Sequence, residues 1–329
     1  MPMRRLSVTV DRFPLARRFT IARGSKTEAA VVTCTFEAGG FRGRGECVPY
    51  ARYGENVETV CAAIEGVREA LEAGADRVAL QSLLPAGAAR NAVDCALWDF
   101  EAKSAGTSVA QLLGIGTPHP IDTAFTISLD TPNEMHRATA AVANRTVLKV
   151  KVGGPDSDAE RMRAVRAASP AARLIIDANE GWRPETIRDH MLVAASIGAF
   201  VVEQPLPAGQ DEILTRMPRP VPVCADESVH GSDDLAALVG RYDYVNLKLD
   251  KTGGLTEGMR FLAEARRLGF GVMAGCMVGS SLGMAPAVLL AQEVELCDLD
   301  GPLLLAEDRP DGLRYEGSTV GVPQAALWG

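Results

Sequence analysis

The pattern of apolar and polar positions divides the chain near residue 120. Before that point, β-branched residues cluster in 5–12 and 29–38, and a glycine-rich segment follows at 39–46. Such short apolar runs between turn residues predict an antiparallel meander, with Gly40, Gly43 and Gly45 interpreted as turn residues. Apolar spacing then predicts helices around 57–73 and 88–104. We therefore expect a small α+β domain over residues 1–120.

From residue 121 to 304 the pattern changes to short apolar strands that alternate with helical stretches. Eight strand-like segments occur, at 121–129, 146–152, 173–179, 199–205, 221–227, 244–250, 271–277 and 295–301, with helical stretches between the second and the eighth. Alternation of this kind predicts parallel strands, and eight units favour a closed (β/α)8 barrel. A doubly wound sheet would need a glycine-rich phosphate loop, which VGGPDSD at 152–158 matches poorly. The short tail, 305–329, is predicted to pack back onto the first domain.

Composition excludes several classes of protein. The 329 residues carry 34 basic and 42 acidic side chains, a net charge of −8, which argues against nucleic-acid binding. No apolar run approaches the ~18 residues of a membrane span, and the N-terminus lacks the apolar core of a signal peptide. Seven cysteines without a Cys-x-x-Cys pair predict a reduced, cytoplasmic protein rather than a disulfide framework. We therefore expect the partner of this protein to be a small molecule, and assembly into a homo-oligomer is an expectation to be tested.

Lysine is scarce in this chain. Of 34 basic residues only six are lysine, namely Lys26, Lys103, Lys149, Lys151, Lys248 and Lys251. Where a plain cation suffices the chain uses Arg, so a retained Lys indicates a task that Arg cannot perform, such as losing its proton in a buried site. Four of the six lysines stand in two pairs near the ends of predicted strands.

Polar side chains occupy strand ends where a packed barrel would carry aliphatic residues. They are Thr126, Lys149, Lys151, Asp177, Asn179, Glu203, Asp226, Asn246, Lys248, Asp250, Cys276, Asp298 and Asp300. The C-terminal ends of the strands carry the active site in barrels of this type. A neutralised structural network could explain one such pair, but buried charge is costly, and a set on consecutive strands indicates function.

The ring order of the strands suggests a chemistry for this set. The second and sixth strands lie opposite each other, so Lys151 and Lys248 would approach a bound molecule from opposite sides. Asp177, Glu203 and Asp226 on adjacent strands form an all-oxygen set that suits Mg²⁺, and the four histidines lie elsewhere. A carboxylate beside Mg²⁺ and a lysine base can lose its α-proton, and a second lysine can return that proton on the other face and invert the centre.

At this point the motifs carry a resemblance to a known family. The segments are KVK (149–151), DANEGW (177–182), EQPLP (203–207), ADES (225–228), NLKLDKTGGLTE (246–257) and CDLDGP (297–302), together with 21–25, 45–55 and 84–99. The chain resembles the enolase superfamily in its muconate-lactonizing-enzyme-like branch, most of all dipeptide epimerases of the L-Ala-D/L-Glu type. The resemblance implies a capping α+β domain (1–120, completed by the return 305–329) over a modified (β/α)7β barrel (121–304).

The resemblance also implies roles for the site residues. Lys151 and Lys248 would be the acid and base, and Asp177, Glu203 and Asp226 the Mg²⁺ ligands. Lys149 would neutralise the substrate carboxylate and depress the pKa of Lys151. Asp298 and Asp300 would bind the α-ammonium of the dipeptide, and Thr126 and Cys276 would line the site between this ammonium and the metal. Arg23 would bind a glutamate side chain, unless it is a solvated surface residue.

Ring geometry and strand alternation refine the expectation for the acidic pair. The eighth strand is opposite the fourth, so Asp298 and Asp300 are expected far from the metal, side by side on one strand face, with no cation in that strand. A substrate ammonium would then be their counter-charge.

Alternatives remain for the reaction. An N-acylamino-acid racemase or a muconate cycloisomerase would not need the acidic pair. A catalytically silent binding barrel would have lost a lysine or a carboxylate, and a Schiff-base lyase needs no carboxylate trio. Lys251, just past the strand, is predicted to make a structural contact. The resemblance implies a cytoplasmic role in recycling cell-wall peptides.

Overall fold

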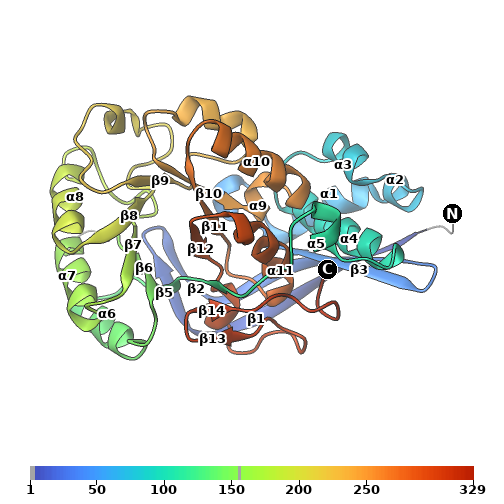
Figure 1. Cartoon of the computed structure of the whole chain (residues 1–329), viewed down its shortest axis with the longest axis horizontal. Helices are drawn as coiled ribbons and strands as arrows, with labels where there is room; N and C mark the ends of the chain where they lie inside the picture. The colour runs from blue at the N-terminus through green and yellow to red at the C-terminus, as the bar shows by residue number, and fades with distance from the viewer. Residues whose placement is uncertain (1–3, 155–156) are drawn as a thin grey trace.

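The N-terminal part of the chain is built on a three-stranded antiparallel sheet. The computed structural model describes residues 4–154 and 157–329. The sheet contains β1 (Arg5–Ile21), β2 (Gly24–Ala38) and β3 (Phe41–Cys47), in that order. The first two strands are longer than predicted, and their hairpin extends from the N-terminal part to the barrel (Figure 1). The tip of this hairpin thus lies far from the sheet's own core.

Helix α4 is the central element of this N-terminal part. The helical elements are η1 (Ala51–Tyr53), α1 (Val57–Gly66), α2 (Arg68–Glu72), α3 (Arg77–Leu83), α4 (Ala88–Ser104) and α5 (Val109–Leu113). Gly43 and Gly45 are inside β3 rather than in turns, which corrects the interpretation from sequence. A Cβ on either residue would lie 2.2 Å from the backbone of α4. Glycine is present there because strand and helix approach too closely for a side chain.

Eight parallel strands form the barrel, as predicted. They are β5 (Phe125–Ile127), β6 (Val147–Lys151), β7 (Arg173–Asp177), β8 (Ala199–Glu203), β9 (Val223–Ala225), β10 (Tyr244–Lys248), β11 (Gly271–Gly275) and β12 (Leu296–Asp298), paired in chain order. Two hydrogen bonds join the ends of the sheet: Ala124 N donates to Cys297 O (2.9 Å), and Leu299 N donates to Thr123 Oγ1 (2.8 Å). The expectation of an eight-stranded α/β barrel is confirmed.

The connections differ from the prediction in two places. The α-helices of this region are α6 (Pro132–Ala140), α7 (Asp158–Ala168), α8 (Ile187–Ser196), α9 (Leu249–Thr252), α10 (Leu255–Arg267) and α11 (Ser281–Leu290). On either side of β9, however, the connections contain only the 3-10 segments η2 (Glu212–Thr215) and η3 (Ser232–Leu238). The first of these connections, 204–222, holds five prolines, which remove backbone donors that an α-helix needs. No helix in the described ranges is long and apolar enough to cross a membrane.

The segment 121–129 is split rather than one strand. Its first part, β4 (Ile121–Asp122), pairs with β14 (Thr319–Val320), which pairs in turn with β13 (Tyr315–Glu316). The remaining 3-10 segments, η4 (Ala291–Glu293) and η5 (Gly301–Leu304), flank β12. The chain therefore enters the barrel only at β5, after a short pairing with its own C-terminal return.

The C-terminal return contacts the N-terminal part at several places, among them β1 and α4. Ala306 N donates to Pro14 O of β1 (2.8 Å), and Trp328 Nε1 donates to Cys95 O of α4 (3.0 Å). Gly329 N also donates to Asp99 Oδ1 (2.7 Å). These contacts support the proposed division into 1–120, 121–304 and the return 305–329, whose boundaries stay a prediction.

Helix α4 also fastens the segment that follows β10. Arg90 Nη2 donates to Thr252 O (2.7 Å), and Asp94 Oδ2 accepts from Thr256 N at the start of α10 (2.9 Å). Asp250 Oδ1 accepts from both Asn91 Nδ2 (2.8 Å) and Val48 N (3.0 Å). Neutral donors alone do not offset the burial of this carboxyl, which raises the pKa of Asp250 to about 7. The residues just after Lys248 are thereby held by the other half of the molecule.

This junction predicts a specific pH dependence of stability. The pKa of Asp250 is about 7 in the folded state and near 3.8 when unfolded, so the unfolded chain loses this proton first as pH rises. The folded state therefore loses stability between about pH 4 and pH 7, by ~1.4 kcal/mol per pKa unit of difference. Asp250→Asn keeps the acceptor and removes the ionisation. Its stability relative to the native chain should therefore be higher at pH 8 than at pH 5, measured by urea unfolding in EDTA.

The control for this measurement is Asp233→Asn, which removes an exposed carboxylate in η3. Its effect should stay within about 0.5 kcal/mol at both pH values. An Asp250→Asn difference that is the same at pH 5 and pH 8 would contradict the assignment.

Candidate active site

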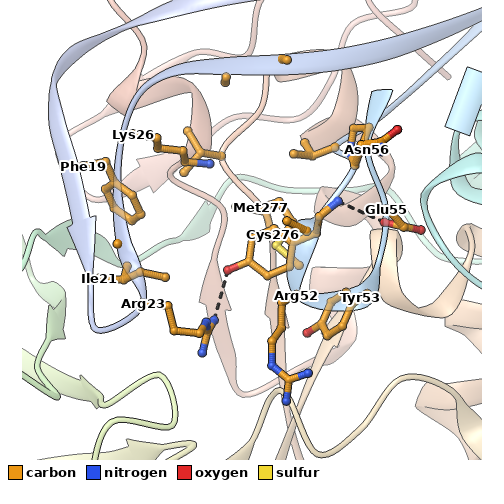
Figure 2. A pocket seen from close by; sticks show the side chains of 18 of the residues that line it. Phe19, Ile21, Arg23, Lys26, Arg52, Tyr53, Glu55, Asn56, Cys276 and Met277 are labelled. Atoms are coloured by element: carbon orange, nitrogen blue, oxygen red, sulfur yellow. Dashed lines mark hydrogen bonds between the residues drawn. The ribbon is translucent and has the colours of Figure 1, made fainter. Parts of the chain in front are cut away.

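A cavity of about 810 Å³ lies between the β1–β2 hairpin, the segment 48–58 and the C-terminal ends of the barrel strands. Figure 2 shows Lys26 and Arg23 on one side of this cavity, with Cys276 and Met277 between them and Tyr53. Five of the predicted site residues line the cavity: Arg23, Lys151, Asp226, Lys248 and Cys276. The other six, Thr126, Lys149, Asp177, Glu203, Asp298 and Asp300, are buried and are not among the lining residues.

Two lysines reach the cavity from opposite strands. Lys151 ends β6 and Lys248 ends β10, four positions apart in the ring of eight strands. Their exposed fractions are only 7% and 6%. Lys151 Nζ donates to Asp177 Oδ2 (2.6 Å), and Lys248 Nζ donates to Asp226 Oδ2 (2.7 Å). The structure thus brings two buried amines to one cavity, each beside a carboxylate.

Three carboxylates occupy the ends of three adjacent strands. Asp177 is the register partner of Glu203, and Asp226 follows β9, two residues beyond the register partner of Glu203. Their positions are held by amides: Asn246 Nδ2 donates to Glu203 Oε1 (2.8 Å), and Gln204 Oε1 accepts from Asp226 N (2.9 Å). All three carboxylates are fully or almost fully buried.

The lysines control the ionisation of these acids. Burial alone would raise the pKa of Asp177, but Lys151 and Lys149 outweigh burial and lower it to about 2. Burial is likewise outweighed at Asp226, where Lys248 and Lys251 lower the pKa well below its usual range. At Glu203, burial and the neighbouring Asp177 prevail over Lys149 and raise the pKa to about 7. The three acids together need more positive charge than the lysines supply.

The donor set fits a hard divalent cation. All three candidate ligands are carboxylates on neighbouring strands, which is the chemistry that Mg²⁺ prefers. As placed, no three Asp, Glu, His or Cys side chains in the described ranges converge as a preformed metal cage. Lysine ammonium groups contact these oxygens and supply part of the positive charge that Mg²⁺ would add.

The environment of Lys149 and Asp298 differs from the prediction. Lys149 is 1% exposed, and its Nζ contacts Asp177 (3.1 Å), Glu203 (2.8 Å) and Asp298 (2.7 Å). Asp298 therefore shares a cation with Glu203, so the expectation that it lies far from the carboxylate trio is wrong. Strand order places β8 and β12 opposite, but a lysine that extends from β6 connects both. A cation thus already contacts one member of the acidic pair, Asp298.

Asp298 and Asp300 are also not on one strand face. Strand β12 ends at Asp298, and Asp300 lies beyond it as the residue before η5. Its Oδ2 accepts from Thr126 N (2.6 Å), while burial and Asp298 raise the pKa of Asp300 to about 7. In the described part of the chain, Asp298 Oδ1 is buried without a hydrogen-bond partner. This oxygen can therefore accept a further hydrogen bond.

Arg23 lies at the turn of the β1–β2 hairpin and is bound to the barrel. Its Nη2 contacts Glu227 Oε1 (2.6 Å), and its Nη1 donates to Asn179 O (2.8 Å) and Glu180 Oε2 (3.1 Å). Tyr50 OH accepts a further bond from Nη2 at 3.1 Å, drawn in Figure 2. Arg23 is therefore a link between hairpin and barrel rather than a solvated residue, and its contact with a substrate stays a prediction.

Several further residues of the site were not assigned from the sequence. Arg52 forms a paired contact with Glu180, at 2.9 and 2.8 Å, and Glu227 holds Arg23. Glu180 and Glu227 lie within the DANEGW and ADES motifs, so the motifs included these residues. The motifs did not indicate, however, that the two side chains bind Arg23 and Arg52. Lys251 Nζ donates to Asp226 O (2.6 Å), Asp226 Oδ1 (2.7 Å) and Asn246 O (2.9 Å). It makes a buried contact past the strand end.

Comparison with known families matches almost the whole chain. Residues 3–114 match the N-terminal domain of the mandelate racemase/muconate lactonizing enzyme family, and residues 134–326 match the enolase C-terminal domain-like family. Among curated relatives, the L-Ala-D/L-Glu epimerase of Escherichia coli is 46% identical over 315 residues, 95% of this chain and 98% of its own length. An N-acetyl-D-glutamate racemase from Pseudoalteromonas is 43% identical over 88% of this chain and 92% of its own length.

Solved structures give the same picture. An enolase family member from Agrobacterium tumefaciens with homology to dipeptide epimerases, solved with sodium and L-Ala-L-Glu, is 56% identical, with a TM-score of 0.97 over 99% of this chain and 100% of the other. A dipeptide epimerase from Cytophaga hutchinsonii, complexed with Mg and D-Ala-L-Val, is 27% identical, with a TM-score of 0.92 over 98% and 94% of the two chains.

Proposed function

The chain belongs to the enolase superfamily, in its mandelate racemase/muconate lactonizing enzyme branch, and on that premise we propose that it epimerises dipeptides of the L-Ala-D/L-Glu type. The observation that carries the proposal is the pair of buried lysines, Lys151 and Lys248, which line one cavity from strands β6 and β10. Near-complete coverage of the Escherichia coli epimerase at 46% identity supports the substrate class. The enzyme is accordingly an isomerase.

The reaction follows from the placement of the two lysines. The amine of one lysine takes the proton from Cα of the C-terminal residue of the dipeptide, and the ammonium of the other returns a proton to the opposite face. One C–H bond breaks and one forms, so the configuration inverts without net change in composition. Lys149 contacts all three of Asp177, Glu203 and Asp298 and holds these side chains in place.

Mg²⁺ is the proposed cofactor, held by Asp177, Glu203 and Asp226. When bound, Mg²⁺ would neutralise these carboxylates and stabilise the negative charge that develops on the substrate carboxylate. Burial alone would lower the pKa of Lys248, but Asp226 now raises it well above its usual range. The same lysine becomes a competent base when Asp226 has another counter-charge.

The α-ammonium of the dipeptide is proposed to bind at Asp298 and Asp300. The buried Asp298 Oδ1, without a partner in the described residues, offers an acceptor for this ammonium, and Cys276 in the cavity wall lies close to both acids. Lys149 occupies only the other oxygen of Asp298 (2.7 Å). A charged donor at a buried carboxylate is favoured over an uncharged amide.

A second candidate function has one observation in its favour. The 43% identity to an N-acetyl-D-glutamate racemase supports racemisation of an N-acylated amino acid in the same cavity. Such a substrate has no ammonium group, so Asp298 would keep Lys149 as its only cation. The two functions therefore differ in what they require of the acidic pair.

The compartment and the source of the substrate are a further part of the proposal. We propose that it acts in the cytoplasm on dipeptides from the recycling of cell-wall peptides. Similarity to the Escherichia coli epimerase and the presence of seven free cysteines support a reducing compartment. Assembly into a homo-oligomer stays a prediction.

The metal proposal predicts loss of turnover in EDTA and recovery with Mg²⁺. Mg²⁺ should also raise the melting temperature of the native chain, because a ligand that binds only the folded state stabilises it. Glu203→Gln should lose this thermal shift together with activity. Full turnover by metal-stripped protein would contradict the proposal.

The lysine proposal predicts two separable half-reactions. Lys151→Ala should lose exchange of the Cα proton with D₂O for one configuration of the second residue, and Lys248→Ala for the other, by about 10²- to 10⁴-fold. Mass spectrometry of L-Ala-L-Glu and L-Ala-D-Glu after incubation measures both. Lys103→Ala, which removes a lysine paired with Asp99 on α4, is the control and should retain both exchanges. Wild-type epimerisation by either active-site variant would refute the assignment.

The ammonium proposal predicts discrimination against N-acylated substrates. The native enzyme should have a much higher kcat/KM for L-Ala-L-Glu than for N-acetyl-L-Ala-L-Glu or N-acetyl-glutamate. Asp298→Asn should reduce this preference by ~1–3 kcal/mol, the contribution of a charged hydrogen bond. The ratio of the free to the acetylated substrate is the readout, because loss of the Lys149 contact affects both alike. Equal values for the native enzyme would favour the N-acylamino-acid racemase.

A further inference from the structure

Of the three lysines among the residues that line the cavity, Lys26, Lys151 and Lys248, only Lys26 has no role in the proposed reaction. It lies on β2, its side chain lines the cavity, and Figure 2 shows its nitrogen directed toward the cavity interior. The other five lysines each contact a carboxylate. Within residues 4–154 and 157–329, the recorded contact of the Lys26 ammonium is with the ring of Phe19, at 6.0 Å from the ring centroid. Lys26 is a cavity cation without an anion.

Its position relative to the reacting groups is defined by the same ring. Phe19 is the cross-strand partner of Lys26, and Lys151 Nζ also lies 6.0 Å from its ring centroid. A substrate that places its Cα at Lys151 and packs on Phe19 would therefore extend its side chain toward Lys26. Burial lowers the pKa of Lys26 to about 8, and Lys151 and Lys248 contribute to this shift. A bound carboxylate would stabilise the charged form of Lys26 and so raise its pKa again.

The other cations of the cavity wall are already engaged. Arg23 is bound to Glu227 and Glu180, and Arg52 is bound to Glu180. Arg12 pairs with Glu28 at the exposed side of the hairpin (2.7 Å). Lys151 and Lys248 contact Asp177 and Asp226 and are assigned to the proton transfer. By elimination among the described lining residues, Lys26 is the cation that can accept a further anion.

We propose that Lys26 binds the side-chain carboxylate of the second residue of the dipeptide and so sets a preference for acidic substrates. The inference rests on the proposed function and specifies the substrate class of the same site. The sequence led us to expect that Arg23 binds a glutamate side chain, but Arg23 holds the hairpin to the barrel. The proposal assigns this binding to Lys26, three positions later in the chain. Chemistry thus comes from the barrel and substrate choice from the hairpin.

The test compares an acidic substrate with its neutral isostere. Lys26→Met keeps the length and removes the charge. Its kcat/KM for L-Ala-L-Glu should fall about 10- to 100-fold, the effect of losing one charged hydrogen bond, while kcat/KM for L-Ala-L-Gln should change less than about twofold. Activity on L-Ala-L-Gln also verifies that the variant is folded. Lys26→Arg should recover part of the preference for L-Ala-L-Glu.

Two further variants complete the comparison. Arg17→Met removes a positive charge from the same hairpin outside the cavity and should leave both substrates unaffected. Arg23→Met should reduce both substrates alike, because it releases the hairpin from Glu227. A loss in Lys26→Met that is equal for the two substrates, or a glutamate-selective loss in Arg23→Met alone, would overturn the assignment of Lys26 while leaving the epimerase function intact. No exchange by the native enzyme with either dipeptide would overturn both.

Discussion

The burial of opposite charges at the C-terminal ends of the barrel strands is the constraint on which the rest of this structure depends. Lys149 has almost no contact with solvent, and its ammonium lies among Asp177, Glu203 and Asp298. Removing one partner from such a cluster leaves an uncompensated buried charge, which typically costs about 3–5 kcal/mol. Each acid must therefore be placed accurately, and short strands in a closed barrel provide that accuracy.

The N-terminal part of the molecule maintains this placement from outside the barrel. Helix α4 binds the segment that follows Lys248 through Arg90, Asn91 and Asp94, and the C-terminal return binds α4 in turn. Strand β3 can approach α4 only because Gly43 and Gly45 lack side chains. The barrel and the N-terminal part thus share one continuous set of buried contacts, with the cavity between them.

The proposed roles assign the reaction to one wall of the cavity and the choice of substrate to the other. The lysines proposed to move protons lie at the ends of barrel strands, whereas Phe19, Arg23 and Lys26 lie on a hairpin that extends from the N-terminal part of the chain. Substitutions in a hairpin can change which substrate binds while they leave the packing of the barrel intact. This is the usual advantage of placing binding residues on connecting segments. Relatives that act on a dipeptide and on an N-acetylated glutamate can therefore share one framework.

The sequence by itself determined the architecture of the barrel and which charged residues lie at one end of it. Alternating strands and helices predicted eight parallel strands. The positions of polar residues at strand ends predicted that Lys151, Lys248 and the three carboxylates lie at one end of the barrel, because strand order alone decides which ends meet. Proline and glycine effects were weaker guides: the prolines in 204–222 converted a predicted helix into a 3-10 segment, and Gly43 and Gly45 lie inside a strand.

Only the tertiary structure decided which charge faces which. Lys149 contacts Asp298 two strands away in the closed ring, and Arg23 is bound by Glu227 and Glu180. Among the described residues, Lys26 has no carboxylate partner. The reason is physical: periodicity reports the direction in which a side chain leaves the backbone, but not how far a long flexible lysine or arginine extends, nor which partner another part of the chain brings within its reach.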